Sequence, residues 1–112
     1  MKYAYPAEKL SAARRCLMLP HLEGEAQSIM HAFHECELGL DGIDTTDIDN
    51  EDVKRWIAKI RELMDTSDIE DPHQRGTWII KAEQLSSVQK FELSRAVDEL
   101  AHWFDREFWG CH

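Results

Sequence analysis

The sequence predicts an all-α fold, a single domain over residues 1–112 in which about four or five helices pack as a small bundle. Apolar residues recur at spacings of three and four along most of the chain, which is the period of an amphipathic helix. Strand signals are nearly absent, because β-branched residues are scattered and no hairpin turn separates alternating segments. Glycine and proline are few and mark the ends of the periodic segments.

Two helices are predicted in the first part of the chain. The first spans about 7–18 and the second about 24–38, because proline or glycine bounds each run of periodic apolar residues. The residues that mark these ends are Pro6, Pro20, Gly39 and Gly42, of which the two glycines are expected to end the second helix. The apolar stripe of the second helix consists of Ile29, Phe33, Cys36 and Leu40.

A third helix is predicted over about 50–64, where the apolar residues fall within about 120° of one another around the helix axis. These residues are Val53, Trp56, Ile57, Ile60, Leu63 and Met64. Asp49 or Asn50 can cap the N-terminus of this helix. The acids that follow lie where the helix dipole favours negative charge.

Two further helices are predicted after a polar loop. The apolar run that begins at Trp78 does not by itself distinguish a strand from a helix, but the residues after it favour a short helix over about 78–85. Ser86 and Gln89 have the spacing of a capping box, which begins a last helix over about 87–109. The apolar face of that helix consists of Leu93, Val97, Leu100, Phe104 and Phe108.

The chain carries 13 Lys and Arg against 22 Asp and Glu, a formal net charge of −9. Direct contact with nucleic acid or with an anionic membrane is therefore disfavoured, because both need clustered basic side chains. No apolar run approaches the roughly 20 residues that span a bilayer, and the N-terminus lacks the apolar stretch of a secretory signal, so we expect a cytoplasmic protein. The cysteines have no Cys-x-x-Cys spacing and are expected to be reduced: Cys16, Cys36 and Cys111.

The excess negative charge is concentrated in residues 37–52, which we call the acidic segment. It contains seven acids and no base: Glu37, Asp41, Asp44, Asp47, Asp49, Glu51 and Asp52. Three interpretations are open. The acids can cap and stabilise the start of the third helix, they can bind calcium, or they can contact a basic partner and raise its association rate.

The calcium interpretation is the weakest of these three. Within residues 41–52, Ile43 and Thr45 stand where an EF-hand has oxygen-rich ligands, and Thr46 stands where it has glycine. The acidic segment is therefore expected to be either a solvated helix cap or a contact surface for a protein with a basic face.

A cluster of potential transition-metal ligands supports an alternative function, a metal-binding helical protein. His31, His34 and Glu35 lie close together on the second helix, and Glu99 and His102 have the Glu-x-x-His spacing of di-iron bundles. Only one such pair is present where the di-iron pattern has two, and the helical period directs His31, Glu35 and His102 away from the apolar faces. The main prediction is therefore a protein without a cofactor, and the alternative binds a transition metal.

Two aromatic residues of the last helix, Phe91 and Trp109, project about 180° from Leu100 on its polar side. We expect the connection at 66–85 and the N-terminal helix to cover them. If they are instead exposed, they form an apolar patch of the kind that marks a protein interface.

The sequence contains no nucleophile elbow, Walker loop or dinucleotide fingerprint, and catalysis is unsupported. We expect a small acidic protein-interaction module that binds and regulates or inhibits a partner with a basic surface, by analogy of class with immunity proteins and other small inhibitors. The candidate contact residues are Asp41, Asp44, Asp47, Asp49, Glu51, Asp52, Phe91 and Trp109. A homodimeric scaffold joined through the last helix is a further alternative.

Overall fold

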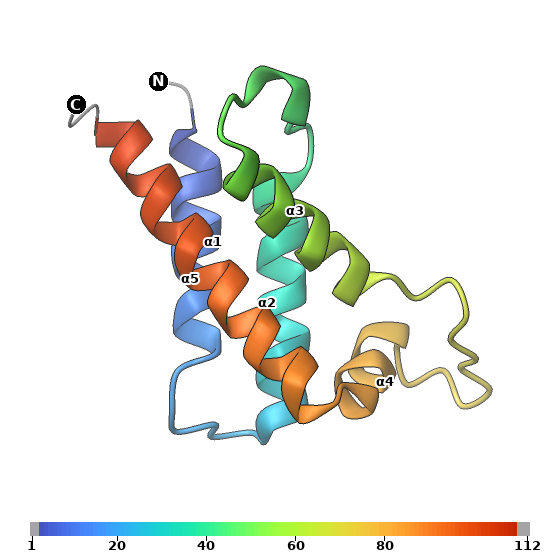
Figure 1. The fold of residues 1–112 in the computed structure, drawn as a ribbon. Helices are drawn as coiled ribbons and strands as arrows, with labels where there is room; N and C mark the ends of the chain where they lie inside the picture. The colour runs from blue at the N-terminus through green and yellow to red at the C-terminus, as the bar shows by residue number, and fades with distance from the viewer. Residues whose placement is uncertain (1–2, 110–112) are drawn as a thin grey trace.

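A computed structural model describes residues 3–109 of the chain (Figure 1). Within this range the fold is all-α, as predicted, with five α-helices, one short 3-10 helix and no strand. The elements are α1 (Ala4–Cys16), α2 (Glu25–Leu40), η1 (Thr45–Asp47), α3 (Glu51–Met64), α4 (Thr77–Gln84) and α5 (Ser87–Trp109). The five α-helices follow the five predicted segments, and η1 is an additional turn within the acidic segment.

The first helix is displaced from its predicted ends. It begins at Ala4 and not at residue 7, because Pro6 occupies the third helical position, where a backbone N–H has no intrahelical acceptor. It ends at Cys16, and the N–H of Leu17 closes the last turn by donating to the carbonyl of Ala13 at 3.3 Å. Pro20 therefore lies well beyond the end of the helix.

The second helix continues through Gly39 to Leu40, so the prediction that Gly39 ends it is wrong. This glycine is buried against α1, where a Cβ would lie 2.8 Å from both the Cβ of Lys9 and the Cδ2 of Leu10. It is present because two helices approach closely there. The turn that follows the helix contains Gly42, whose φ of 78° suits a residue without a Cβ.

The helices form a bundle in which α1 packs against both α2 and α5, while α3 packs on α5 and α4 packs on α2 (Figure 1). The predicted apolar stripes of α2, α3 and α5 are buried together in one core. Its largest side chains include Leu10, Phe33, Ile57, Leu100 and Phe104. Among residues 3–109, no helix is both long enough and apolar enough to cross a membrane.

The short helix α4 confirms the helical interpretation of the apolar run at Trp78. The indole Nε1 of this residue donates to the carbonyl of Met64 at 3.3 Å, which fixes α4 to the end of α3. The capping box at the start of α5 is also present: the N–H of Ser86 donates to Gln89 Oε1 at 2.8 Å, and the N–H of Gln89 donates to Ser86 Oγ at 3.1 Å.

Asn50 caps α3, since its Oδ1 accepts hydrogen bonds from the N–H groups of Asp52 at 3.0 Å and Val53 at 3.2 Å. We expect Asn50→Ala to lower the free energy of unfolding by about 1 kcal/mol, because two N–H groups lose their acceptor. Urea denaturation measures this change. Asp49→Ala, at the other residue predicted as a cap, is the control and should change stability by less than about 0.5 kcal/mol. Equal losses would contradict the assignment.

Candidate functional site

The acidic segment covers the end of α2, the loop after it, η1 and the first turn of α3, at one end of the bundle (Figure 1). Ile48, which is 2% exposed, fixes the segment to the core. All seven acidic side chains lie on the surface. The segment is therefore anchored to the core and presents a concentrated negative charge on the surface.

Three of the seven acids have partners close by in the chain. Asp44 accepts a hydrogen bond from the hydroxyl of Thr46 at 2.7 Å and another from its backbone N–H at 2.9 Å. These two bonds hold the pKa of Asp44 below its usual value. The other two acids that have partners are Glu51 and Asp52. Each forms an ion pair with a cation about one turn further along α3: Glu51 with Lys54, and Asp52 with Arg55. Glu51 and Asp52 lie in the first turn of α3, where the helix dipole favours negative charge, while the cap itself is Asn50.

The remaining four acids have no comparable partner. The carboxylates of Glu37, Asp41, Asp47 and Asp49 are exposed and make no hydrogen bond or ion pair with another residue of 3–109. Their charge is not compensated within the described chain. These four carboxylates are therefore the part of the acidic segment that a basic partner can use.

A hollow of about 310 Å³ gathers Asp41, Asp44 and Asp47 beside the start of α1. Tyr5 forms part of its wall and is 50% exposed, with the Nζ of Lys9 lying 5.4 Å from the ring centroid. Carboxylates next to an exposed aromatic ring are suited to a lysine or arginine side chain. Sequence reasoning missed Tyr5, because it is far from the acidic segment along the chain and no local spacing connects the two.

The predicted metal ligands do not come together. Within residues 3–109 no group of three or more His, Cys, Asp or Glu side chains is placed to hold a metal ion, in the acidic segment or elsewhere. On α2, the Nε2 of His31 lies 3.8 Å from a carboxylate oxygen of Glu23, and Glu35 faces α1, with Lys9 Nζ 3.7 Å from its Oε2. His31 and Glu35 thus each contact a different residue, and they do not form a common metal site.

The other three candidates are also separate. His34 meets the ring of Trp78, with 6.3 Å between the ring centroids. On α5, the Nδ1 of His102 lies 2.8 Å from the backbone carbonyl of Asp98, and Glu99 is exposed on the same helix. The contact of His102 with Asp98 is a local pair at helical spacing, whereas the contact of His34 with Trp78 joins α2 to α4.

Neither described cysteine is activated. Cys36 is fully buried on the apolar face of α2, and burial raises the pKa of its thiol to about 12. Cys16 is half-buried, and burial followed by the nearby Glu35 carboxylate raises the pKa of that thiol as well. Both thiols stay protonated at neutral pH and are poor nucleophiles. Cys111 lies outside the described residues.

Phe91 and Trp109 are not covered, contrary to expectation, and are 67% and 66% exposed. The connection expected to cover them leads into α4, which packs on α2 and not on this face of α5. Phe91 lines a shallow hollow with Leu17 and Met18 from the end of α1. Trp109 stands about 27 Å further along α5, so the two aromatic residues do not form one patch.

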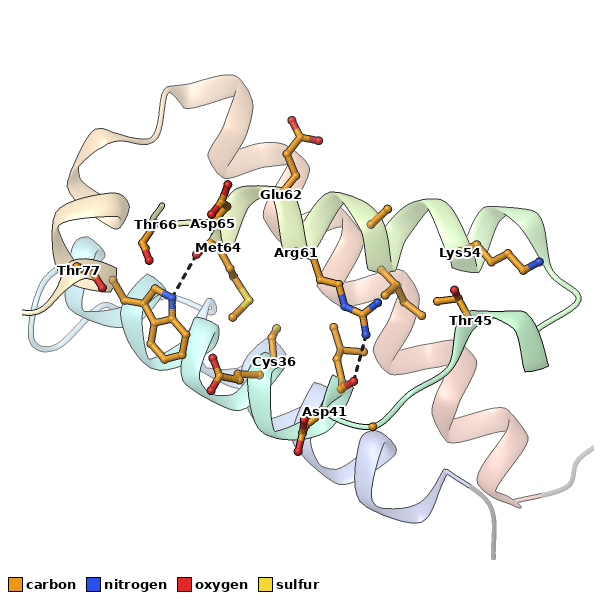
Figure 2. Close-up of a pocket in the computed structure, with 16 residues that line it drawn as sticks. Cys36, Asp41, Thr45, Lys54, Arg61, Glu62, Met64, Asp65, Thr66 and Thr77 are labelled. Carbon is orange, nitrogen blue, oxygen red and sulfur yellow. Dashed lines mark hydrogen bonds between the residues drawn. The ribbon is translucent and has the colours of Figure 1, made fainter. Parts of the chain in front are cut away.

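A groove of about 1080 Å³ lies between α2 and α3 (Figure 2). We call it the α2–α3 groove. In its middle, Arg61 of α3 donates to the carbonyls of Leu40 at 3.3 Å and Ile43 at 3.4 Å, where α2 ends. The indole of Trp78 closes the far end through its bond to Met64. Sequence reasoning missed this groove, because periodicity does not say which helices are neighbours.

The groups gathered on these surfaces include carboxylates, aromatic rings and apolar side chains, and the groove is also lined by Lys54, Arg61 and three threonines. No member of the known protein families, no curated protein and no solved structure was found to match this chain.

Proposed function

We propose that this chain is a non-catalytic interaction module whose acidic segment binds a basic surface on a partner protein and thereby regulates or blocks it. The observation that carries this proposal is the division of the acids. Glu51 and Asp52 are neutralised by neighbouring cations, whereas the carboxylates of Asp41, Asp47 and Asp49 are exposed without one. Unpaired carboxylates that lie close together raise the local negative potential that attracts a basic partner.

The test neutralises the unpaired acids and leaves the structural ones in place. Asp41→Asn, Asp47→Asn and Asp49→Asn are combined, while Asp44 is retained because its carboxylate binds Thr46. The matched control removes the same amount of charge from exposed acids elsewhere. Its substitutions are Asp68→Asn, Glu70→Gln and Asp105→Asn.

Each form is immobilised, and the partner that the wild-type chain retains is purified for affinity measurements over a range of salt concentrations. At low salt we expect the first triple variant to bind at least about tenfold more weakly, mainly through slower association. The difference should shrink as salt rises, because salt screens exposed charges. The control triple variant should lose much less. Equal losses in the two variants, or none in either, would refute a specific role for the acidic segment.

A further inference from the structure

The α2–α3 groove lies between two helices that have separate neighbours. α2 packs on α1 and α4, whereas α3 packs on α5, and the two helices make little contact with each other. Hydrogen bonds hold the opening at two places, from Arg61 to the carbonyls at the end of α2 and from Trp78 to Met64. Figure 2 draws the bond from Arg61 to Leu40 and the bond from Trp78 to Met64 as dashed lines. Hydrogen bonds therefore link the walls of the groove at two places.

The floor of the groove is apolar and reaches the core. Cys36, Leu40 and Ile57 line it and are at most 4% exposed, while Met64 and Trp78 are half-buried at one end. Methionine and tryptophan side chains suit an interface, since the first adapts its shape and the second supplies a large rigid surface.

One stripe of α3 forms the outer wall. It contains Lys54, Ala58 and Arg61, at spacings of four and three, so these residues share one face of the helix, and the lining continues to Met64, where the helix ends. From Lys54 to Met64 this wall is about 15 Å long, which is close to three turns of α-helix. At its centre Ala58 is exposed and small, so the wall is low at that point.

The charge around the groove is mainly negative. Four carboxylates line it against two cations: Glu37, Asp41, Glu62 and Asp65 against Lys54 and Arg61. Both cations already have acceptors, since Lys54 pairs with Glu51 at 3.4 Å and Arg61 binds backbone carbonyls.

Two of these carboxylates remain available to a ligand. Glu62 lies 3.4 Å from Lys59, and Asp65 accepts hydrogen bonds from Ser67. Glu37 and Asp41, on the α2 edge, also belong to the unpaired part of the acidic segment. The groove and the acidic segment are thus continuous.

We propose that the α2–α3 groove binds an amphipathic helix of about three turns from the partner, with its apolar face on the groove floor and its lysine or arginine side chains over Glu37 and Asp41. This inference rests on the proposed function and adds the secondary structure and the charge of the contacting segment. The length of the α3 wall sets the length of the helix, and the excess of carboxylates sets the sign of its charge.

The probe is a fluorescent peptide of about 14 residues, built from leucine and lysine at helical spacing, with binding followed by anisotropy. A second peptide of the same composition alternates leucine and lysine and so has no helical apolar face. Ala58→Trp fills the groove from an exposed position, and Gln84→Trp places the same side chain at an exposed position of α4 outside the groove. Ala58→Arg adds a repelling charge without the aromatic bulk. Circular dichroism and thermal melting show whether each variant is folded.

We expect the helical peptide to bind the wild-type chain at least about tenfold more tightly than the alternating peptide, and both Ala58 variants to lose at least about tenfold of that affinity. Gln84→Trp should bind as the wild type does. If the Ala58 variants keep full affinity while the triple Asp→Asn variant binds weakly, the groove inference is wrong and the acidic segment alone is the contact. Failure of the helical peptide to bind any form also overturns the groove inference. It is overturned as well if the wild-type chain self-associates and Ala58→Trp makes it monomeric, because a second copy of the chain then occupies the groove.

Discussion

Phe33→Ala is expected to lower the free energy of unfolding by about 3–5 kcal/mol, the largest effect of any single truncation that we propose. Phe33 is fully buried on α2, and its ring lies 6.4 Å from that of Trp78, centroid to centroid. The substitution removes apolar contact area and leaves a cavity between α2 and α4 that a close-packed core refills only in part. Since small domains are stable by about 5–15 kcal/mol, the variant loses a large fraction of its total stability.

Urea denaturation and thermal melting measure this loss, with a fall in melting temperature of about 4–8 °C for each kcal/mol. The matched control is Phe91→Ala, which makes the same truncation at a side chain that is 67% exposed. We expect that control to change stability by less than about 0.5 kcal/mol. Similar losses in the two variants would mean that Phe91 is covered, as its position on α5 first led us to expect, and would remove the basis for calling it a surface residue.

The helices could be predicted because their determinants are local. The stripe of Ile29, Phe33, Cys36 and Leu40 is buried as its spacing indicates. The cap at Asn50 is formed between residues two and three positions apart. Such signals depend on the 3.6-residue period and on the unsatisfied N–H groups of a helix start, and neither requires knowledge of the rest of the fold.

The surfaces could be predicted only in part, because they depend on which helices are neighbours. The acidic segment is visible as a count of charges, yet only the structure separates Asp44, whose carboxylate binds Thr46, from Asp47, whose carboxylate is unpaired. The α2–α3 groove depends on the contact of Arg61 with Leu40, residues that are 21 positions apart in sequence. No periodicity indicates a contact of that kind.

Gly39 shows how a local signal can be misinterpreted. Glycine is common just beyond the end of a helix, so a glycine near the end of an apolar stripe predicts the end of the helix. Here it lies inside α2 because α1 crosses at that point, with no space for a side chain. Its conformational cost in the helix is about 1 kcal/mol relative to alanine, and close packing of the two helices offsets it.

This interpretation makes Gly39→Ala destabilising, although alanine is the better helix former. A Cβ at position 39 would lie 2.8 Å from the Cδ2 of Leu10, which can rotate away, and 2.8 Å from the Cβ of Lys9, which cannot move without its backbone. Overpacking of this kind costs typically about 1–3 kcal/mol, which exceeds the gain of about 1 kcal/mol from helix propensity over most of that range. We therefore expect a net loss of up to about 2 kcal/mol in urea denaturation.

The control for this variant is Glu37→Ala, an exposed substitution to the same residue on the same helix. It should change stability by less than about 0.5 kcal/mol, since it removes no described contact and brings alanine's higher helix propensity. The sign of the Gly39→Ala result is decisive. A gain in stability would mean that helix propensity dominates at this position and that α1 and α2 are further apart than the structure shows. A loss of stability would mean that the added methyl group disrupts the contact between the two helices.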